Sequence, residues 1–308
     1  MSTIFINITG LKSKAGRAGI GIMACMLIGL IMPACQEQYN ELPTYAINGS
    51  RKERPQGSLY IIGGSKRTPE IVKDMARSAA HRGDYCLVFP HSGAEPDSSF
   101  YYIARDFEAH TTMRLVNISD GKLRTSLIDS VRAAPLIFIT GGDQNRFLER
   151  VHPAVRRAIR EAYYGGATVG GTSAGAALMG AVMITGDQRD YPFYESTYAR
   201  LHHGNGIYAE GLGLVDSIII DQHFIARSRY NRLISALADT GYPYAAGVEE
   251  ETALLIHPEY CTVVGDKQVV LMERPLEFKN VKNRIGLRNM PLHIHLPGDT
   301  FHLKQQYP

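Results

Sequence analysis

Short apolar runs that alternate with helical patterns constrain the fold of this chain more than any other feature. The runs at 58–62 and 136–140 each end in two glycines, and apolar residues at helical spacing recur in 69–82 and 155–163. Continuous apolar runs of this length are typical of strands buried on both faces of a parallel sheet. Strands that alternate with helices place those helices on both sides of the sheet. The sequence therefore predicts an α/β fold.

The same patterns continue toward the C-terminus, where helices become rare. We expect a helix of small residues from Ala174 to Met183 and another from Tyr230 to Ala238. From residue 244 onward the apolar runs follow one another closely, which predicts a β-rich C-terminal portion. Other expected strands lie at 85–89, 112–118, 167–170, 218–220, 244–248, 252–256, 260–264 and 269–272.

The first 35 residues have the features of an export signal. Basic residues precede an uncharged run from Ala18 to Ala34, and Cys35 follows directly. A small residue before cysteine resembles the lipobox of bacterial lipoproteins, so we expect a signal peptide at 1–35 and lipidation of Cys35. The protein would then be exported and lipid-anchored to the bacterial envelope, with the polar stretch 36–56 as a tether. A plain signal peptide and a single membrane anchor are the alternatives.

Charge and cysteine content argue against two classes of function. Three of the 33 basic residues and none of the 30 acidic residues lie before residue 35, so the rest of the chain is near neutral. A near-neutral chain has no electrostatic basis for binding nucleic acid. Cys86 and Cys261 lie in separate apolar segments, and no Cys-x-x-Cys pair indicates zinc. We expect neither a metal nor a cofactor.

Gly171-Thr172-Ser173-Ala174-Gly175 is the sharpest motif in the chain. It follows a predicted strand and begins a predicted helix, which is the setting of a nucleophile elbow. The free amides at the start of the helix are suited to an oxyanion. A glycine-rich packing turn and a phosphate-binding turn are the alternatives. A phosphate-binding turn normally carries a lysine, and this motif has none.

A serine nucleophile needs a base and an acid that orients the base. His223 comes directly after the strand 218–220, and catalytic groups of parallel sheets gather at the carboxyl ends of strands. Glu249, Glu250 and Glu251 follow the next predicted strand in the same way. Alternation of side chains along a strand does not decide which of these acids points toward the site.

The order of these residues separates two classes of enzyme. An α/β-hydrolase runs serine, acid, histidine, whereas this chain offers Ser173, then His223, then the acids. The α/β-hydrolase alternative would need a later histidine as its base, namely His257, His293, His295 or His302. Two of these, His293 and His295, lie in a proline-flanked tail without a strand end, so the order argues against an α/β-hydrolase.

Five motifs together resemble those of the cyanophycinase family, which are serine exopeptidases related to the aspartyl dipeptidases. The resemblance covers about residues 57–275, which we take as the peptidase domain, and leaves 276–308 as a C-terminal extension. It implies a flavodoxin-like fold related to class I glutamine amidotransferases. The motifs are Ile61-Ile62-Gly63-Gly64, Thr140-Gly141-Gly142-Asp143-Gln144, Gly171-Thr172-Ser173-Ala174-Gly175-Ala176, Asp221-Gln222-His223-Phe224 with Arg227, Arg229 and Arg232, and Glu249-Glu250-Glu251-Thr252-Ala253.

The resemblance also assigns roles to individual residues. It implies Ser173 as the nucleophile, His223 as the base and Glu250 as the acid that orients the base. Glu249 stands where the family is expected to have aspartate, which is a mild departure. The residues that match the family's substrate pocket are Gln144, Asp221, Gln222, Arg227, Arg229 and Arg232.

Amide hydrolysis also needs donors for the oxyanion and contacts with the substrate. The amide of Ala174 lies next to the nucleophile, and the turn at Gly142 can supply a second donor because glycine lets a backbone approach closely. Three arginines suit substrate carboxylates, because guanidinium forms paired bonds to carboxylate oxygens. Asp221 would suit a substrate arginine.

We therefore expect a serine peptidase that acts on cyanophycin or on related aspartyl peptides. Cyanophycin is a poly-aspartate backbone with arginine attached through the side-chain carboxyls, so its cleavage would release β-aspartyl-arginine. The alternatives are a lipid-tethered, non-catalytic binding protein for acidic peptides and an α-aspartyl dipeptidase. Whether the protein forms a homodimer is left open.

Overall fold

The computed structural model describes residues 54–191, 193 and 195–303. The expected signal peptide at 1–35, its Cys35 and most of the expected tether lie outside the described residues. None of the described helices is long and apolar enough to span a bilayer.

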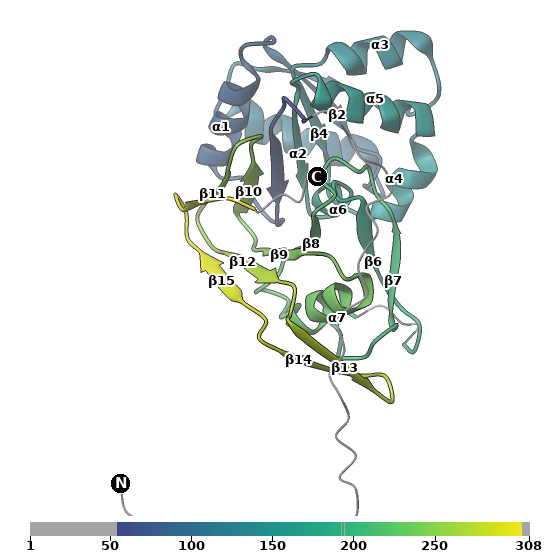
Figure 1. Ribbon diagram of the computed structural model, residues 1–308. Coiled ribbons are helices and arrows are strands. Elements are labelled where there is room, and N and C mark those ends of the chain that lie inside the picture. Colours follow the sequence, from purple (N-terminus) through teal and green to yellow (C-terminus); the bar gives the residue numbers. More distant parts are fainter. Residues whose placement is uncertain (1–53, 192, 194, 304–308) are drawn as a thin grey trace, which may run out of the picture. The chain divides into compact units, whose positions relative to one another are not determined.

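An eight-stranded sheet forms the first half of the architecture (Figure 1). Five of its strands are parallel, and the last three join antiparallel at one edge. The parallel strands, in spatial order, are β1 (Leu59–Ile62), β5 (Thr168–Thr172), β4 (Leu136–Ile139), β2 (Tyr85–Phe89) and β3 (Arg114–Asn117). The antiparallel strands beside β1 are β10 (Thr252–Ile256), β11 (Cys261–Gly265) and β16 (Thr300–Phe301).

A second, four-stranded sheet contains the remaining predicted strands. Its order is β15 (Leu292–His295), β12 (Val269–Glu273), β9 (Tyr244–Val248) and β8 (Ile218–Gln222), with only β8 and β9 parallel. Ser173 therefore follows a strand of one sheet, whereas His223 follows a strand of the other. Apolar periodicity predicted β8, β9 and β12 but not the exposed β15, and it does not report the division into two sheets, because these three strands are continuous buried runs like those of the first sheet.

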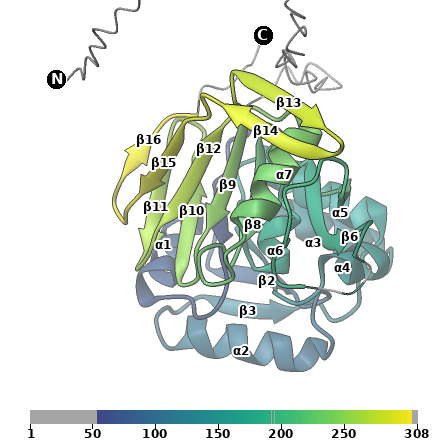
Figure 2. The same ribbon diagram turned by 90° about the horizontal axis from the view of Figure 1, so that it is seen from below.

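Helices cover both faces of the eight-stranded sheet (Figure 2). On one face, α1 (Pro69–Ala79) and α2 (Pro96–Glu108) enclose an apolar cluster with alternate residues of the strands. On the other, α3 (Thr125–Ala133), α5 (Pro153–Tyr164) and the second sheet share the largest core. The far side of the second sheet packs against α7 (Tyr230–Thr240). The expected α/β class with a β-rich C-terminal portion is confirmed.

Local signals explain why a helix begins where α1 does. Thr68 is its N-cap and accepts a hydrogen bond from the amide of Ile71, and Pro69 occupies the first turn, where its missing N–H costs nothing. The apolar residues Ile71 and Met75 are buried on one face of the helix. The spacing of the apolar residues and the capping residues therefore both predict the helix α1.

The helix expected from Ala174 to Met183 is wrong in its length. The structure has α6 at Ala174–Ala177, and the strand β6 (Val182–Gln188) begins soon after it. The carbonyls of Leu178, Met179 and Gly180 accept hydrogen bonds from the amides of Leu212, Leu214 and Gly213, respectively. Pairing with a distant segment replaces the next helical turn, and β6 then forms a hairpin with β7 (Gly206–Glu210).

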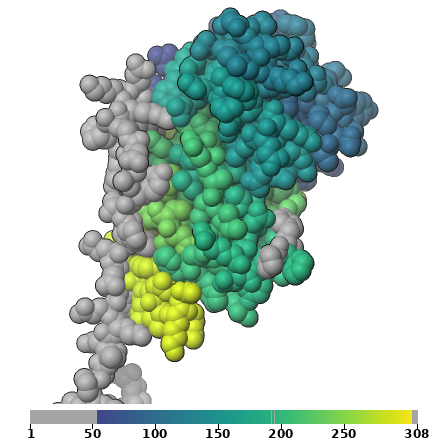
Figure 3. All heavy atoms as spheres, turned by 90° about the vertical axis from the view of Figure 1, so that its right-hand side faces the viewer, coloured from purple at the N-terminus to yellow at the C-terminus, as the bar shows by residue number. Residues whose placement is uncertain are grey.

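The described part of the C-terminal extension adds to both sheets. After the hairpin of β13 (Glu277–Val281) and β14 (Arg284–Arg288), β15 joins the second sheet and β16 joins the first. Figure 3 shows residues of this segment, in yellow, standing at the molecular surface.

Candidate active site

Ser173 lies at a sharp turn between β5 and α6, as a nucleophile elbow requires. Its backbone has φ 53° and ψ −112°, which few residues other than glycine adopt. Its amide donates to the carbonyl of Ile62 in β1, and this bond helps to hold the turn against the sheet. The strained backbone presents the side chain at the end of the strand, beside the start of a helix.

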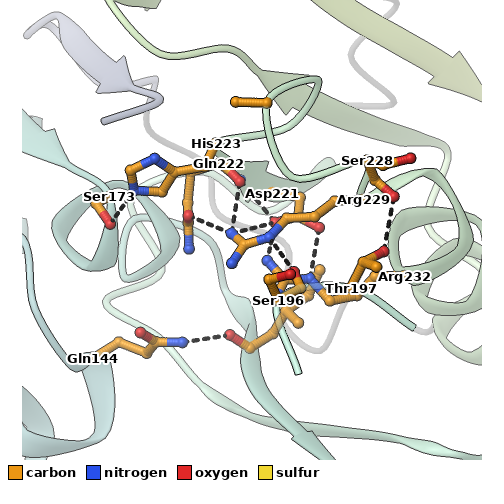
Figure 4. A network of polar contacts seen from close by, with 12 residues as sticks. Gln144, Ser173, Ser196, Thr197, Asp221, Gln222, His223, Ser228, Arg229 and Arg232 are labelled. Atoms are coloured by element: carbon orange, nitrogen blue, oxygen red, sulfur yellow. Dashed lines mark hydrogen bonds and ion pairs between the residues drawn. The ribbon is translucent and has the colours of Figure 1, made fainter. Parts of the chain in front are cut away.

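A continuous chain of hydrogen bonds joins Ser173, His223 and Glu250. His223 Nε2 lies 2.9 Å from Ser173 Oγ, and His223 Nδ1 lies 2.7 Å from Glu250 Oε1. Figure 4 shows the imidazole of His223 above Ser173. The order of partners is that of a nucleophile, a base and an acid that orients the base.

The carboxyl end of β1 fixes all three segments of this chain. Three successive carbonyls, those of Ile62, Gly63 and Gly64, each accept a hydrogen bond. The donors are the amides of Ser173, His223 and Glu251, at 3.0, 2.8 and 3.0 Å. One strand of the first sheet thus aligns a serine from its own sheet with a histidine and a glutamate that follow strands of the second.

Each of the three consecutive acids has a different contact. Glu249 is buried and accepts hydrogen bonds from the amides of Ile225 and Ala226, so it fixes the turn after His223. Glu251 Oε2 lies 3.9 Å from Lys267 Nζ, and its Oε1 accepts a hydrogen bond from the hydroxyl of Ser65. Only Glu250 of the three reaches the imidazole. The supporting contact of Glu249 was not predicted, because its partners are backbone groups that a sequence pattern does not identify.

Burial and charge favour the neutral form of His223. Removal from water lowers the pKa of its imidazole below the ordinary 6.5, although the hydrogen bond to Glu250 acts in the opposite direction. The positive charges of Arg227 and Arg229 lower this pKa further. The neutral imidazole is the form that can accept a proton from serine.

A cavity of about 250 Å³ opens beside Ser173. The predicted residues that line it are Gly142, Gln144, Gln222, Arg227, Arg229 and Arg232. Asp143, Asn145 and the stretch 185–187 of β6 also line it and were not predicted as substrate contacts. The hairpin of β6 and β7 was itself missed, because the expected helix extended into its first strand.

Gly142 lies where a backbone must approach closely. Its φ is 137°, and a Cβ atom there would come within 2.2 Å of the carbonyl oxygen of Ser92. The neighbouring amide of Asp143 donates to that same oxygen, which fixes the turn. Gly142 therefore lies on the pocket wall next to Ser173, while Ala174 is buried at the start of α6.

The three arginines differ in how they are held, and Figure 4 shows two of them, Arg229 and Arg232. Arg229 is buried and donates through Nη1 to the backbone carbonyl and the side-chain oxygen of Gln222, and through Nε to the carbonyl of Ser196. Arg232 is buried and paired with Asp221. Arg227 is only half-buried, and its side chain has no hydrogen-bond or ion-pair partner among the described residues. Arg227 is therefore the one with its guanidinium available to a ligand.

Asp221 contacts arginines behind the pocket. Its side chain is fully buried; Arg232 Nε lies 2.8 Å from Oδ2 and Arg229 Nη1 lies 3.6 Å from Oδ1. It does not line the cavity, so this geometry places it as a support for the arginines. Gln144 ties α4 (Gln144–Arg150) to β6, because its Nε2 donates to the carbonyls of Ile184 and Thr185.

Comparison with known proteins identifies the family. Residues 59–264 match the family model described as peptidase family S51. The chain belongs to peptidase family S51. The expected resemblance and the expected enzyme class, a serine-type exopeptidase, are thereby confirmed.

Relatives of this S51 peptidase cover most of its length. A cyanophycinase from Geminocystis herdmanii is 29% identical and one from Trichormus variabilis is 30% identical; the matches cover 88% and 89% of this chain and 97% and 96% of those relatives. A solved structure of a peptidase from an acI-B1 Actinobacterium superposes with a TM-score of 0.60 at 16% identity, covering 81% of this S51 peptidase and 98% of that chain. That likeness shows a shared fold.

No group of three or more histidine, cysteine, aspartate or glutamate side chains in the described residues of the S51 peptidase is arranged to hold a metal ion. The two described cysteines, Cys86 and Cys261, are free, and burial raises the pKa of both thiols. Buried, protonated thiols of this kind are poor nucleophiles. The candidate chemistry of the described residues therefore centres on Ser173.

Proposed function

We propose that this chain hydrolyses the backbone amides of peptides that carry β-linked aspartyl units, of which the β-aspartyl-arginine units of cyanophycin are the leading example, through a Ser173–His223–Glu250 triad. The observation that carries the proposal is the pair of contacts at 2.9 and 2.7 Å that joins the three side chains. The cyanophycinase relatives support the substrate class.

Ser173 Oγ attacks the carbonyl carbon of the scissile amide while its proton passes to Nε2 of His223. Glu250 accepts a hydrogen bond from Nδ1, which keeps Nε2 free to receive that proton and stabilises the imidazolium. The protonated His223 then gives the proton to the leaving nitrogen as the C–N bond breaks. Water, deprotonated by His223, hydrolyses the ester and restores Ser173.

Backbone amides of Gly142 and Ala174 are proposed to stabilise the oxyanion. Gly142 lines the cavity beside Ser173, and Ala174 provides an amide at the first position of α6. Preorganised donors of this kind typically supply about 3–4 kcal/mol of transition-state stabilisation each.

Charges of both signs line the pocket, which supports a substrate that carries both. Arg227 presents a guanidinium to a free carboxylate, which the arginine of a β-aspartyl-arginine unit and the C-terminal end of such a substrate both carry. Asp143 and Asp187 lie on the pocket wall, where a substrate guanidinium would meet a carboxylate. We therefore assign the contact with a substrate arginine to Asp143 and Asp187. The sequence suggested Asp221 for this contact, but Asp221 is buried against Arg232.

The test is product analysis with purified protein on cyanophycin beside a panel of α- and β-aspartyl peptides. We expect β-aspartyl-arginine from cyanophycin, preference for peptides that carry a β-linked aspartyl unit, labelling by a fluorophosphonate, and no turnover by folded Ser173→Ala. Cleavage of α-linked peptides alone would instead indicate an α-aspartyl dipeptidase. Binding without cleavage by the wild type, and no labelling, would indicate a non-catalytic binding protein.

A further inference from the structure

The strand β15 leaves one edge of the second sheet open. It pairs with β12 on one side, and no strand of the described residues pairs with its other side. The amide of Glu273 donates to the carbonyl of Pro291, so the alternation of an antiparallel ladder directs the backbone groups of His293 and His295 toward β12. The N–H and C=O groups of Leu292 and Ile294 consequently point outward.

Exposed apolar side chains gather at this same edge. Leu292, Ile294 and Leu296 are 44%, 58% and 52% exposed and share one face of the strand. Leu276, 74% exposed, lies nearby, because its amide donates to the carbonyl of Asn289. An edge strand of a monomer is commonly protected by lysine or a bulge, and no lysine lies between 291 and 297. An open edge with clustered apolar residues is typical of an interaction surface.

The sequence of this edge is its own complement. The residues from 291 to 297 read the same in both directions: Pro291-Leu292-His293-Ile294-His295-Leu296-Pro297. An antiparallel pairing with a second copy, centred on Ile294, would place leucine opposite leucine and histidine opposite histidine. The prolines would end the ladder on both sides, because proline cannot donate to it. An isologous twofold interface requires this kind of self-complementarity.

We propose that β15 pairs with β15 of a second copy of this chain, about a twofold axis at Ile294, and so joins two four-stranded sheets into one. In this register the two Ile294 residues exchange their outward N–H···O=C bonds. Leu292 of each copy lies opposite Leu296 of the other. The apolar side chains of the two copies then cover one another on one face, with Leu276 extending the contact.

The first test is the oligomeric state of the full chain, measured by analytical ultracentrifugation over a range of micromolar concentrations. We expect the wild type to dimerise, and Ile294→Lys to raise the dissociation constant at least about tenfold while keeping the peptidase activity, because a charge at the axis meets its own copy. Leu123→Lys is the matched control, since Leu123 is 52% exposed elsewhere, and it should remain dimeric. A monomeric wild type, or a dimer unaffected by Ile294→Lys, would overturn the proposal.

The second test determines which residues of the two β15 strands lie opposite one another, and it does not require a substitution that weakens the dimer. In a background with Cys25→Ser and Cys35→Ser, Ile294→Cys should form a disulfide with its own copy, because the paired Cα atoms of such a ladder lie about 5.5 Å apart. Leu292→Cys should cross-link only when mixed with Leu296→Cys. Cys86 and Cys261 are buried and should not contribute. Cross-links in another register, or none, would contradict the pairing, including the case in which another part of the chain covers the edge.

Discussion

Gly64 lies so close to His223 that a Cβ atom on residue 64 would come within 2.2 Å of the imidazole Cε1. The backbone of Gly64 also has φ 128°, which residues with a side chain rarely adopt. The absence of a side chain at this position is therefore a condition for the orientation of His223 toward Ser173.

Gly64→Ala should leave a folded protein whose catalytic efficiency is at least about 100-fold lower, because misplacing a catalytic group by about 1 Å has an effect of that size. Steady-state kinetics with a β-aspartyl peptide measures the loss, and circular dichroism checks the fold. Gly204→Ala is the matched control: its φ is 76°, but nothing lies within 4 Å of the added atom. A loss no greater than that of the control would show that His223 does not depend on the space at Gly64.

The pH profile should report the environment of His223. Burial lowers the pKa of this imidazole, so the acid limb of kcat/KM should have its midpoint below 6.5, with activity lost as the pH falls through it. Arg227→Gln removes a positive charge that disfavours the imidazolium, and should move the limb to higher pH. Glu250→Gln should move it to lower pH and reduce kcat. If the acid limb has the same midpoint in the wild type, in Arg227→Gln and in Glu250→Gln, the group that titrates is not His223.

Arg227 should contribute to recognition of a substrate carboxylate. A charge-assisted hydrogen bond contributes about 1.5–3 kcal/mol, so Arg227→Ala should lower catalytic efficiency roughly ten- to a hundredfold on a β-aspartyl substrate with a free carboxylate. The same variant should lose little on the form with that carboxylate amidated. Arg105→Ala, which alters an exposed arginine of α2, serves as the control. Equal losses on both forms would remove Arg227 from carboxylate recognition.

Asp221 should matter for stability as much as for activity. It is the buried counter-ion of Arg232 and lies 3.6 Å from Arg229, so Asp221→Asn leaves buried positive charge uncompensated. Loss of one partner of a buried ion pair typically costs about 3–5 kcal/mol of the free energy of unfolding. Denaturant unfolding measures this. The control is Arg77→Gln, which removes an exposed partner of Asp74 and should change the free energy of unfolding by no more than about 1 kcal/mol. If Asp221→Asn and Arg77→Gln have equal effects, Asp221 is not a stabilising buried counter-ion.

Cys35→Ala should abolish incorporation of a palmitate analogue and move the protein from the membrane fraction to the soluble fraction. The basis is the basic start, the uncharged run and the Ala34-Cys35 junction of the sequence. Fractionation with immunoblotting follows the protein in both forms. Labelling that persists in the variant would count against a lipid at this position.

The candidate catalytic residues that come together could be chosen from the sequence where the choice depended on residue type and chain order. Ser173 and His223 could be chosen because each follows a predicted strand, and their contact at 2.9 Å places them as a nucleophile and base would lie. Alternation could not choose among the three consecutive acids, because the chain turns at Glu251, whose φ is 59°. The resemblance named Glu250, and the structure places it against the imidazole.

Contacts between distant segments were not predictable. A pattern that identifies three arginines near one another does not show that Arg232 is neutralised by Asp221, since the pairing depends on how α7 packs against β8. The early end of α6 has the same origin, because the competing hydrogen bonds come from residues 212–214.

The three carbonyls at the end of β1 separate the alignment of the catalytic groups from the shape of the pocket. The segments that carry Ser173, His223 and Glu250 are hydrogen-bonded to the carbonyls of Ile62, Gly63 and Gly64, at the end of a buried strand. The stretch 185–187, which lines the cavity, belongs instead to the hairpin of β6 and β7. Substitutions in that hairpin can therefore change which peptide fits while the reacting atoms keep their spacing. A laboratory search for altered substrate preference would accordingly randomise 185–187 and leave 62–64 untouched.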